Sequence, residues 1–148
     1  MSERLELTAW KTLRMAEPEI EILDIIIDCA DPASLASFWG ELLGLPIAGR
    51  KGPYVWLQRS AHAPGLGFQK VSQPKTGKNR VHLDVSASDI AAAKLRIEAL
   101  GGRRVDGFED GGFLVMADPE GNEFCVVPTA PFDFDEQGRT HYLDNLES

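Results

Sequence analysis

The same succession of sequence features occurs twice in this chain, and a constant offset of 58 residues relates the two copies. The paired positions lie in a predicted strand, at a helix start, after a helix and in a later strand: Asp24 and His82, Asp31 and Asp89, Gly44 and Gly102, Val55 and Phe113. Because one offset relates so many features, we predict two tandem copies of one structural unit. This repeat limits the fold more strongly than any other feature of the sequence.

The first unit is predicted to contain a strand, a helix and three further strands. Alternating apolar residues indicate a strand within residues 20–29. Asp31 and Pro32 are suited to the N-cap and the first position of a helix, which carries an apolar stripe and ends at Gly44. Later strands are expected near residues 54–59 and 66–71.

The second unit repeats this order and begins with a strand of two distinct faces. Val81, Leu83 and Val85 are expected to point toward a core, and His82 and Asp84 toward the opposite side. A helix starting at Ser88 or Asp89 follows, and then strands near 103–108, 113–117 and 123–127.

The expected fold class is therefore α+β, with two βαβββ modules in tandem at residues 20–72 and 78–128. Neither module can bury both faces of its sheet alone. We expect helices to cover one face of each sheet, and the other faces to form a curved mixed sheet or half-barrel around a cleft. Residues 20–128 would form a single domain, with an N-terminal extension at 1–19 and an acidic C-terminal tail at 129–148, neither of which has an assigned role.

Charge and hydropathy exclude some classes of partner. The formal net charge of −8 disfavours nucleic acid, whose binding requires clustered Lys and Arg. The apolar runs are too short for a membrane-spanning helix, and the N-terminus does not resemble a signal peptide. We therefore expect a cytoplasmic protein that binds neither nucleic acid nor a membrane.

Strand alternation predicts which polar residues face the cleft. If the helices cover the apolar strand faces, Asp24 and His82 point into the cleft from equivalent places. In the last strand, the same alternation turns Cys125 inward. Cys29 falls on the helix side of its own strand, so we expect no disulfide between Cys29 and Cys125.

Three motifs of the chain resemble the vicinal oxygen chelate superfamily, which contains glyoxalase I, bleomycin-resistance proteins and extradiol dioxygenases. The motifs are Asp31-Pro32 before a helix with Phe38-Trp39 and Leu43-Gly44-Leu45, then Asn79-Arg80-Val81-His82-Leu83-Asp84, then Asp118-Pro119-Glu120-Gly121-Asn122-Glu123-Phe124-Cys125. The resemblance covers about residues 20–128 and is nearest to the glyoxalase-like domain proteins. It implies the two-module fold described above.

The resemblance also implies a metal site, at positions that metal-dependent members usually fill with His, Glu, His and Glu. In this sequence the four positions fall on Asp24, Gln69, His82 and Cys125, so only the His at the third position is kept. A set with oxygen, nitrogen and sulfur donors suits none of the common catalytic ions well, although zinc and iron stay open. Glu123 could replace Cys125 if the strand carried a bulge. The cofactor is therefore unknown, and a divalent metal is one candidate.

The first functional hypothesis is a diverged, lyase-like enzyme with a degenerate metal site. His82 and Asp84 are its candidate catalytic residues, with His82 as general acid or base and Asp24 or Asp84 orienting it. The alternative role of Asp84 is an ion pair with Arg80, which lies on the same strand face.

The second hypothesis is a protein that binds and sequesters a small organic molecule of antibiotic type without turnover. Its candidate ligand-binding residues are Trp56, Phe68 and Phe113, aromatic residues on strands that could line the cleft, and the alternative role of Trp56 and Phe68 is in the core. Under either hypothesis the partner is a small molecule. Members of the superfamily often dimerise, and exposed strand edges favour the same state here, so a homodimer is expected.

Overall fold

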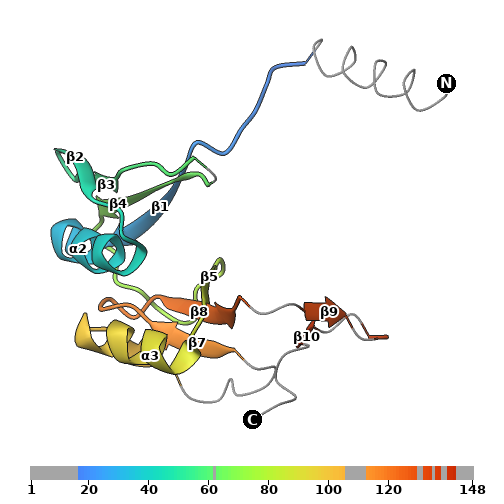
Figure 1. The fold of residues 1–148 in the computed structure, drawn as a ribbon. Coiled ribbons are helices and arrows are strands. Elements are labelled where there is room, and N and C mark those ends of the chain that lie inside the picture. The colour runs from blue at the N-terminus through green and yellow to red at the C-terminus, as the bar shows by residue number, and fades with distance from the viewer. Residues whose placement is uncertain are drawn as a thin grey trace.

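The computed structural model describes residues 17–61, 63–105, 113–129, 132–134, 136–137 and 140–142. The first module contains β1 (Asp24–Cys29), α2 (Pro32–Leu43), β2 (Ile47–Lys51), β3 (Tyr54–Leu57) and β4 (Gly65–Lys70). The second contains β5 (Leu83–Ala87), α3 (Ile90–Ala99), β6 (Arg103–Arg104), β7 (Leu114–Ala117) and β8 (Glu123–Pro128). Figure 1 shows the two modules one above the other.

Each module forms a four-stranded mixed sheet, with strand order β1-β4-β3-β2 in the first and β5-β8-β7-β6 in the second. In both sheets the first strand pairs in parallel with the last, and the other pairs are antiparallel. The parallel register is identical, because Asp24 faces Gly65 and Leu83 faces Phe124, each 41 residues further along. This confirms the predicted α+β fold of two βαβββ modules.

The helix starts also agree with the sequence. The side chain of Asp31 accepts a hydrogen bond from the backbone N–H of Ser34, and Pro32 occupies the first turn. Asp89 caps α3 in the same way through the backbone N–H of Ala92. Two acidic caps at an offset of 58 residues therefore set where both helices begin.

The repeat is one residue out of step at the helix ends. Gly44 follows α2 in the left-handed conformation, with φ of 67°. In the second module the left-handed residue is Gly101, with φ of 105°, and not Gly102 as the offset predicts. The difference arises because α3 is shorter than α2.

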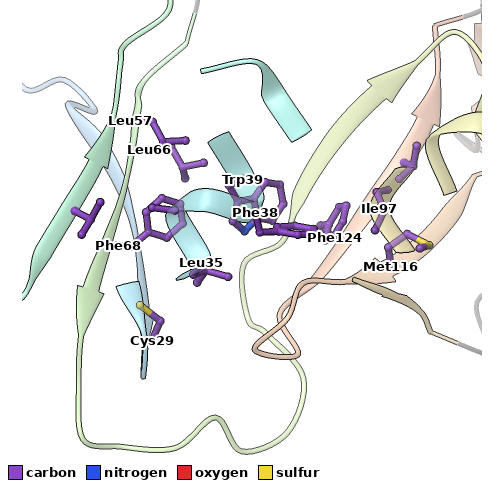
Figure 2. Packing of buried hydrophobic residues seen from close by; sticks show 13 residues of the cluster. Cys29, Leu35, Phe38, Trp39, Leu57, Leu66, Phe68, Ile97, Met116 and Phe124 are labelled. Atoms are coloured by element: carbon purple, nitrogen blue, oxygen red, sulfur yellow. The ribbon is translucent and has the colours of Figure 1, made fainter. Parts of the chain in front are cut away.

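A core of apolar side chains joins the two modules through α2. In Figure 2, Leu35, Phe38 and Trp39 of α2 lie between Phe68 of the first sheet and Phe124 of the second. The ring centroids of Trp39 and Phe124 are 4.8 Å apart in an edge-to-face arrangement. The modules therefore share a single core across α2.

Two residues predicted to belong to the core are exposed. Leu23 is 66% exposed and Val81 is 75% exposed, because β1 begins only at Asp24 and β5 only at Leu83. A residue before the strand start lies at the end of the sheet, where alternation no longer places its side chain under a helix.

The described part of the C-terminal region contains two short strands. β9 (Phe132–Phe134) and β10 (Thr140–Tyr142) pair as an antiparallel ribbon. No helix in the described ranges has the length and apolar character needed to cross a bilayer. Most of the predicted N-terminal extension, residues 1–16, lies outside the described residues.

Candidate functional site

Three side chains with metal-ligating or acid-base chemistry meet on the second sheet. Asp84 on β5 and Cys125 on β8 are partners across the parallel pair, and His82 immediately precedes β5. The Nε2 atom of His82 lies 3.3 Å from Oδ1 of Asp84. Ligand atoms of the three residues all lie within 4.8 Å of one another, and we call this group the His82 cluster.

The His82 cluster lies on the sheet face opposite the core. Phe124 and Val126, on either side of Cys125 along β8, are fully buried, and alternation places Cys125 on the other face. The side chains of His82 and Asp84 are 45% and 62% exposed. Asp84 contacts His82, and no ion pair joins it to Arg80 in the described part of the chain. Of the two contacts considered for Asp84, the one with His82 is therefore observed, whereas the catalytic role of both residues stays a prediction.

The thiol of Cys125 is held in its protonated form. Partial burial raises its pKa, and the negative charge of Asp84 and a hydrogen bond to its carboxylate raise it further, against a smaller lowering by Lys78. A nucleophilic cysteine needs the opposite environment, one that stabilises the thiolate. Cys29 lies on the core side of β1, and both cysteines are free.

The carboxylate of Asp24 forms an ion pair with Arg59 on the first module. Its Oδ1 atom accepts a hydrogen bond of 2.7 Å from Arg59, whose other terminal nitrogen donates to the backbone oxygen of Leu23. Asp24 belongs to no group of three or more potential metal-binding His, Cys, Asp or Glu residues among the described residues. The structure therefore does not bring Asp24 together with the His82 cluster.

Gln69 does not share a site with Asp24. Asp24 pairs with Gly65, and Gln69 pairs with Asp28, four residues further along β1. Four residues of strand span about 13 Å. The repeat offset relates Cys125 to Gly67, which has no donor, and a Cβ at Gly67 would lie 2.8 Å from Cδ1 of Ile26. The four positions that the resemblance implied therefore do not fit a metal ion shared by the two modules.

Glu123 does not replace Cys125 in such a set. β8 pairs with β5 in an uninterrupted register, so the strand lacks the required bulge. Glu123 accepts hydrogen bonds from the backbone N–H of Asn79 at 3.0 Å and from Nζ of Lys75 at 3.2 Å. Burial alone would raise the pKa of Glu123, but these hydrogen bonds and the Lys75 charge outweigh it, and the net pKa is lowered.

The three aromatic candidates lie in different surroundings. Phe68 is fully buried beneath α2, as the alternative core role of this residue requires, and a contact with a ligand stays a prediction. Trp56 is 41% exposed on the opposite face of that sheet, and its ring lies so close to Gly49 that a Cβ there would be 2.5 Å from Cζ2. Phe113 is half-buried just before β7. Neither Trp56 nor Phe113 lines the cavity described next, and their role as ligand contacts stays a prediction.

A cavity of about 910 Å³ lies between the modules, bordered by the edge strands β1 and β5. Its apolar lining comes from both modules and from the connector: Ile25, Ile26, Ile27, Trp39, Val71, Pro74, Val81 and Leu83. Its charged and amide lining includes Asp28, Gln73, Asn79, Arg80, Glu120 and Asn122. This lining was not predicted from the sequence, although the apolar run Ile25-Ile26-Ile27 and the position of Arg80 before a strand point to it.

The cavity wall is held together by contacts between the modules. Glu120 accepts hydrogen bonds from the backbone N–H groups of Ala30 at 2.6 Å and Asp31 at 2.9 Å. Buried Asp118 accepts one of 3.1 Å from the indole Nε1 of Trp39. The sequence indicated only a turn here, because the partners lie about 80–90 residues away.

Comparisons with known proteins agree with this architecture. Residues 24–127 match the family model described as the glyoxalase-like domain. No curated protein matches the sequence.

Solved structures share the fold at low sequence identity. A glyoxalase/bleomycin resistance protein/dioxygenase family enzyme from Burkholderia phytofirmans is 16% identical over 74% of this chain and 98% of its own, with a TM-score of 0.61. A glyoxalase-related enzyme from Fulvimarina pelagi is 19% identical over 84% and 99% of the two chains, with a TM-score of 0.59. The trypanothione-dependent glyoxalase I of Leishmania major is 16% identical over 74% and 87%, with a TM-score of 0.58.

At these identities the likeness establishes the fold, whereas the family model covers most of the chain and identifies the family. Both agree with the two identical parallel registers and the single core across α2. The chain therefore belongs to the glyoxalase-like domain family of the vicinal oxygen chelate superfamily.

Proposed function

We propose that this protein binds a small organic molecule in the cavity between its two modules. The observation that carries the proposal is the cavity itself, whose volume of about 910 Å³ lies within the usual range of about 300–1,000 Å³ for small-molecule sites. Its lining is mixed, with apolar side chains beside a nearly equal share of charged and amide groups that could orient a ligand.

The charged lining residues indicate the chemistry of the ligand. Lys75 is paired with Glu123, and Glu120 is occupied by two backbone N–H groups. Arg80 has no such ion pair in the described ranges, so its guanidinium is free to bind an anionic group. We therefore expect a ligand with an aromatic or heterocyclic body and a carboxylate.

Catalysis at this site would rest on His82 and Asp84. Val81 and Leu83 line the cavity, and strand alternation turns His82, which lies between them, toward the opposite face, so a ligand would have to extend past this strand to meet the imidazole. Asp84 would orient the ring. The contact between His82 and Asp84 is the observation that supports acid-base chemistry of a diverged lyase-like enzyme, and the raised pKa of the Cys125 thiol argues against nucleophilic catalysis.

The alternative is a protein that binds and sequesters its ligand without turnover. The exposed His82 cluster favours this alternative, because His82 and Asp84 are largely open to water rather than enclosed with a substrate. His82→Ala separates the two functions. In an enzyme it abolishes turnover while binding persists, and in a sequestering protein no turnover exists to be lost.

The binding proposal is tested with a panel of small aromatic and heterocyclic carboxylates, screened by thermal shift and quantified by calorimetry. Arg80→Ala should weaken binding of any hit by about tenfold or more, because it removes a charge-assisted contact. Arg50→Ala removes an exposed arginine of β2 outside the cavity and is the matched control. Equal affinity of the Arg80 and Arg50 variants would refute the proposed place of the carboxylate.

We also propose that the protein is a homodimer, as the exposed edge of β1 suggests. β1 is an outer strand of its sheet, and apolar residues beside it are exposed: Ile20, Ile22, Leu23 and Ile26. Light scattering should give twice the mass of the 16.2 kDa chain, and a monomeric mass would refute the proposal. The cytoplasmic location predicted from the sequence stays a prediction.

A further inference from the structure

We propose that the ligand of the cavity between the modules carries an amine as well as a carboxylate, at opposite ends of an aromatic body, and that Asp28 binds the ammonium group. This inference rests on the proposed function, because it concerns the same cavity. It adds a second anchoring residue, and it narrows the class of ligand from aromatic carboxylates to zwitterions with separated charges.

The charged residues of the cavity lining differ in whether the protein itself already pairs their charge. Lys75 and Glu123 form an ion pair of 3.2 Å. Each carboxylate oxygen of Glu120 accepts a hydrogen bond from a backbone N–H group. The side chains of Asp28 and Arg80 form neither an ion pair nor a hydrogen bond within the described part of the chain. These two residues therefore offer the lining charges that a ligand can neutralise.

The two unpaired charges have opposite signs and belong to different modules. Asp28 lies on β1 of the first module, and Arg80 lies just before β5 of the second. Both line the cavity without forming an ion pair with each other, so their charges are held apart. The cavity volume of about 910 Å³ is that of a sphere about 12 Å across, which accommodates an aromatic ring with a charged group at each end. Separated charges fit this arrangement better than the adjacent charges of an α-amino acid.

The negative charge on the β1 side of the cavity already acts on a neighbouring group. Cys29 also lines the cavity. Burial, and then nearby acidic charges led by those of Glu120 and Asp28, raise the pKa of the Cys29 thiol to about 11. The electrostatic field that disfavours a thiolate here would stabilise the cationic end of a ligand.

Asp28 should also discriminate against ligands that lack an amine. Its side chain is exposed, so its carboxylate is hydrated before a ligand binds. A neutral ligand end beside it would displace this water without supplying a hydrogen-bond donor, whereas an ammonium group supplies both donors and the opposite charge. Asp28 would therefore determine specificity, and Arg80 in the other module would determine the direction in which the ligand lies.

The test compares three ligands of similar size by calorimetry at neutral pH. The zwitterion para-(aminoethyl)benzoate carries both charges, para-propylbenzoate has a methyl group in place of the ammonium group, and phenylethylamine lacks the carboxylate. We expect the wild type to bind the zwitterion about three- to tenfold more tightly than either of the others, since each of these lacks one charge-assisted contact at a partly exposed site.

Two variants separate the contributions of the two anchoring residues. Asp28→Asn should weaken binding of the zwitterion about three- to tenfold and leave the affinity for para-propylbenzoate unchanged. Arg80→Ala should weaken binding of both benzoates by a similar factor. Glu98→Gln removes a surface carboxylate of α3 outside the cavity and is the matched control, which should keep the preference of the wild type.

Equal affinity of the wild type for the two benzoates, or a preference for the zwitterion that survives Asp28→Asn, would overturn this inference and leave the proposed function intact. Binding of neither benzoate would also overturn it, and the panel of carboxylates described above then decides the proposed function separately. The comparison of ligands on the wild type needs no variant. Because Asp28 is exposed, the fold of Asp28→Asn is expected to be unchanged and is checked by circular dichroism.

Discussion

The hydrogen bond between Trp39 and Asp118 should be a main determinant of how the two modules are held together. Asp118 is 2% exposed, and its carboxylate accepts hydrogen bonds from the Trp39 indole at 3.1 Å, from the side chain of Asn122 at 2.9 Å, and from two backbone N–H groups at 3.0 Å. Trp39 belongs to α2 of the first module and Asp118 to the turn before β8. Removing either partner therefore tests a contact between modules.

The expected loss for Asp118→Ala is about 3–5 kcal/mol of unfolding free energy. Each hydrogen bond to a charged group contributes about 1.5–3 kcal/mol, and a buried donor left without an acceptor costs about 1–3 kcal/mol. Asn122 and the backbone donors are only half-buried and can bind water after the change. Trp39 is 1% exposed, so its indole N–H cannot. We therefore count the indole penalty in full and the other losses in part.

The assay is urea unfolding of the wild type, Trp39→Phe, Asp118→Ala and the double variant. The double-mutant cycle should give a coupling of about 1.5–3 kcal/mol between the two residues. The exposed helix pair Lys94 and Glu98, with nitrogen and oxygen 2.9 Å apart, is the matched control and should couple by about 0.3–0.5 kcal/mol. A coupling below about 0.5 kcal/mol for Trp39 and Asp118, with unchanged denaturant slope, would refute the reasoning.

Three further predictions concern single residues. Burial, and then nearby acidic charges, raise the pKa of Cys29 to about 11 from 9.0. As pH rises, the unfolded chain therefore loses the thiol proton before the folded chain does, and the free energy of unfolding falls between about pH 9 and about pH 11. Relative to Cys29→Ala, the wild type should lose about 2–3 kcal/mol over that interval, and parallel pH profiles in urea unfolding would contradict this. Gly102→Ala should cost about 1–3 kcal/mol, because its Cβ would lie 2.5 Å from Cγ2 of Ile97, and an unchanged midpoint of thermal unfolding would count against it. Glu120→Gln keeps the shape of the side chain but removes the negative charge that accepts hydrogen bonds from the backbone N–H groups of Ala30 and Asp31. The free energy of unfolding in urea should fall by about 0.5–1.5 kcal/mol, and an unchanged value would show that this contact adds no stability.

The sequence predicted the features that depend on local pattern. The acidic caps Asp31 and Asp89 and the alternation that buries Phe124 and places Cys125 on the opposite face of the strand are properties of short segments, and the structure shows each of them. The constant offset predicted the two-module fold because it relates these segments to one another.

The features that were missed depend on distant partners. Leu23 looked like a core residue, but the strand begins after it. Phe68 and Trp56 are both strand aromatics, and only the position of α2 determines which one is buried. The misplacement of Gln69 followed from the parallel register of β1 and β4, which no local pattern reveals. The cavity lining was missed for the same reason, since it joins segments from both modules.

The most direct test of the central claim is an amide spectrum of isotope-labelled protein titrated with a small aromatic carboxylate that binds in the thermal-shift screen. If the ligand occupies the cavity between the modules, the largest shifts should fall on residues 25–30 of β1 and its following turn and on residues 79–83 before and in β5. Shifts confined to the outer sheet face around Trp56, with none at those two segments, would contradict the account.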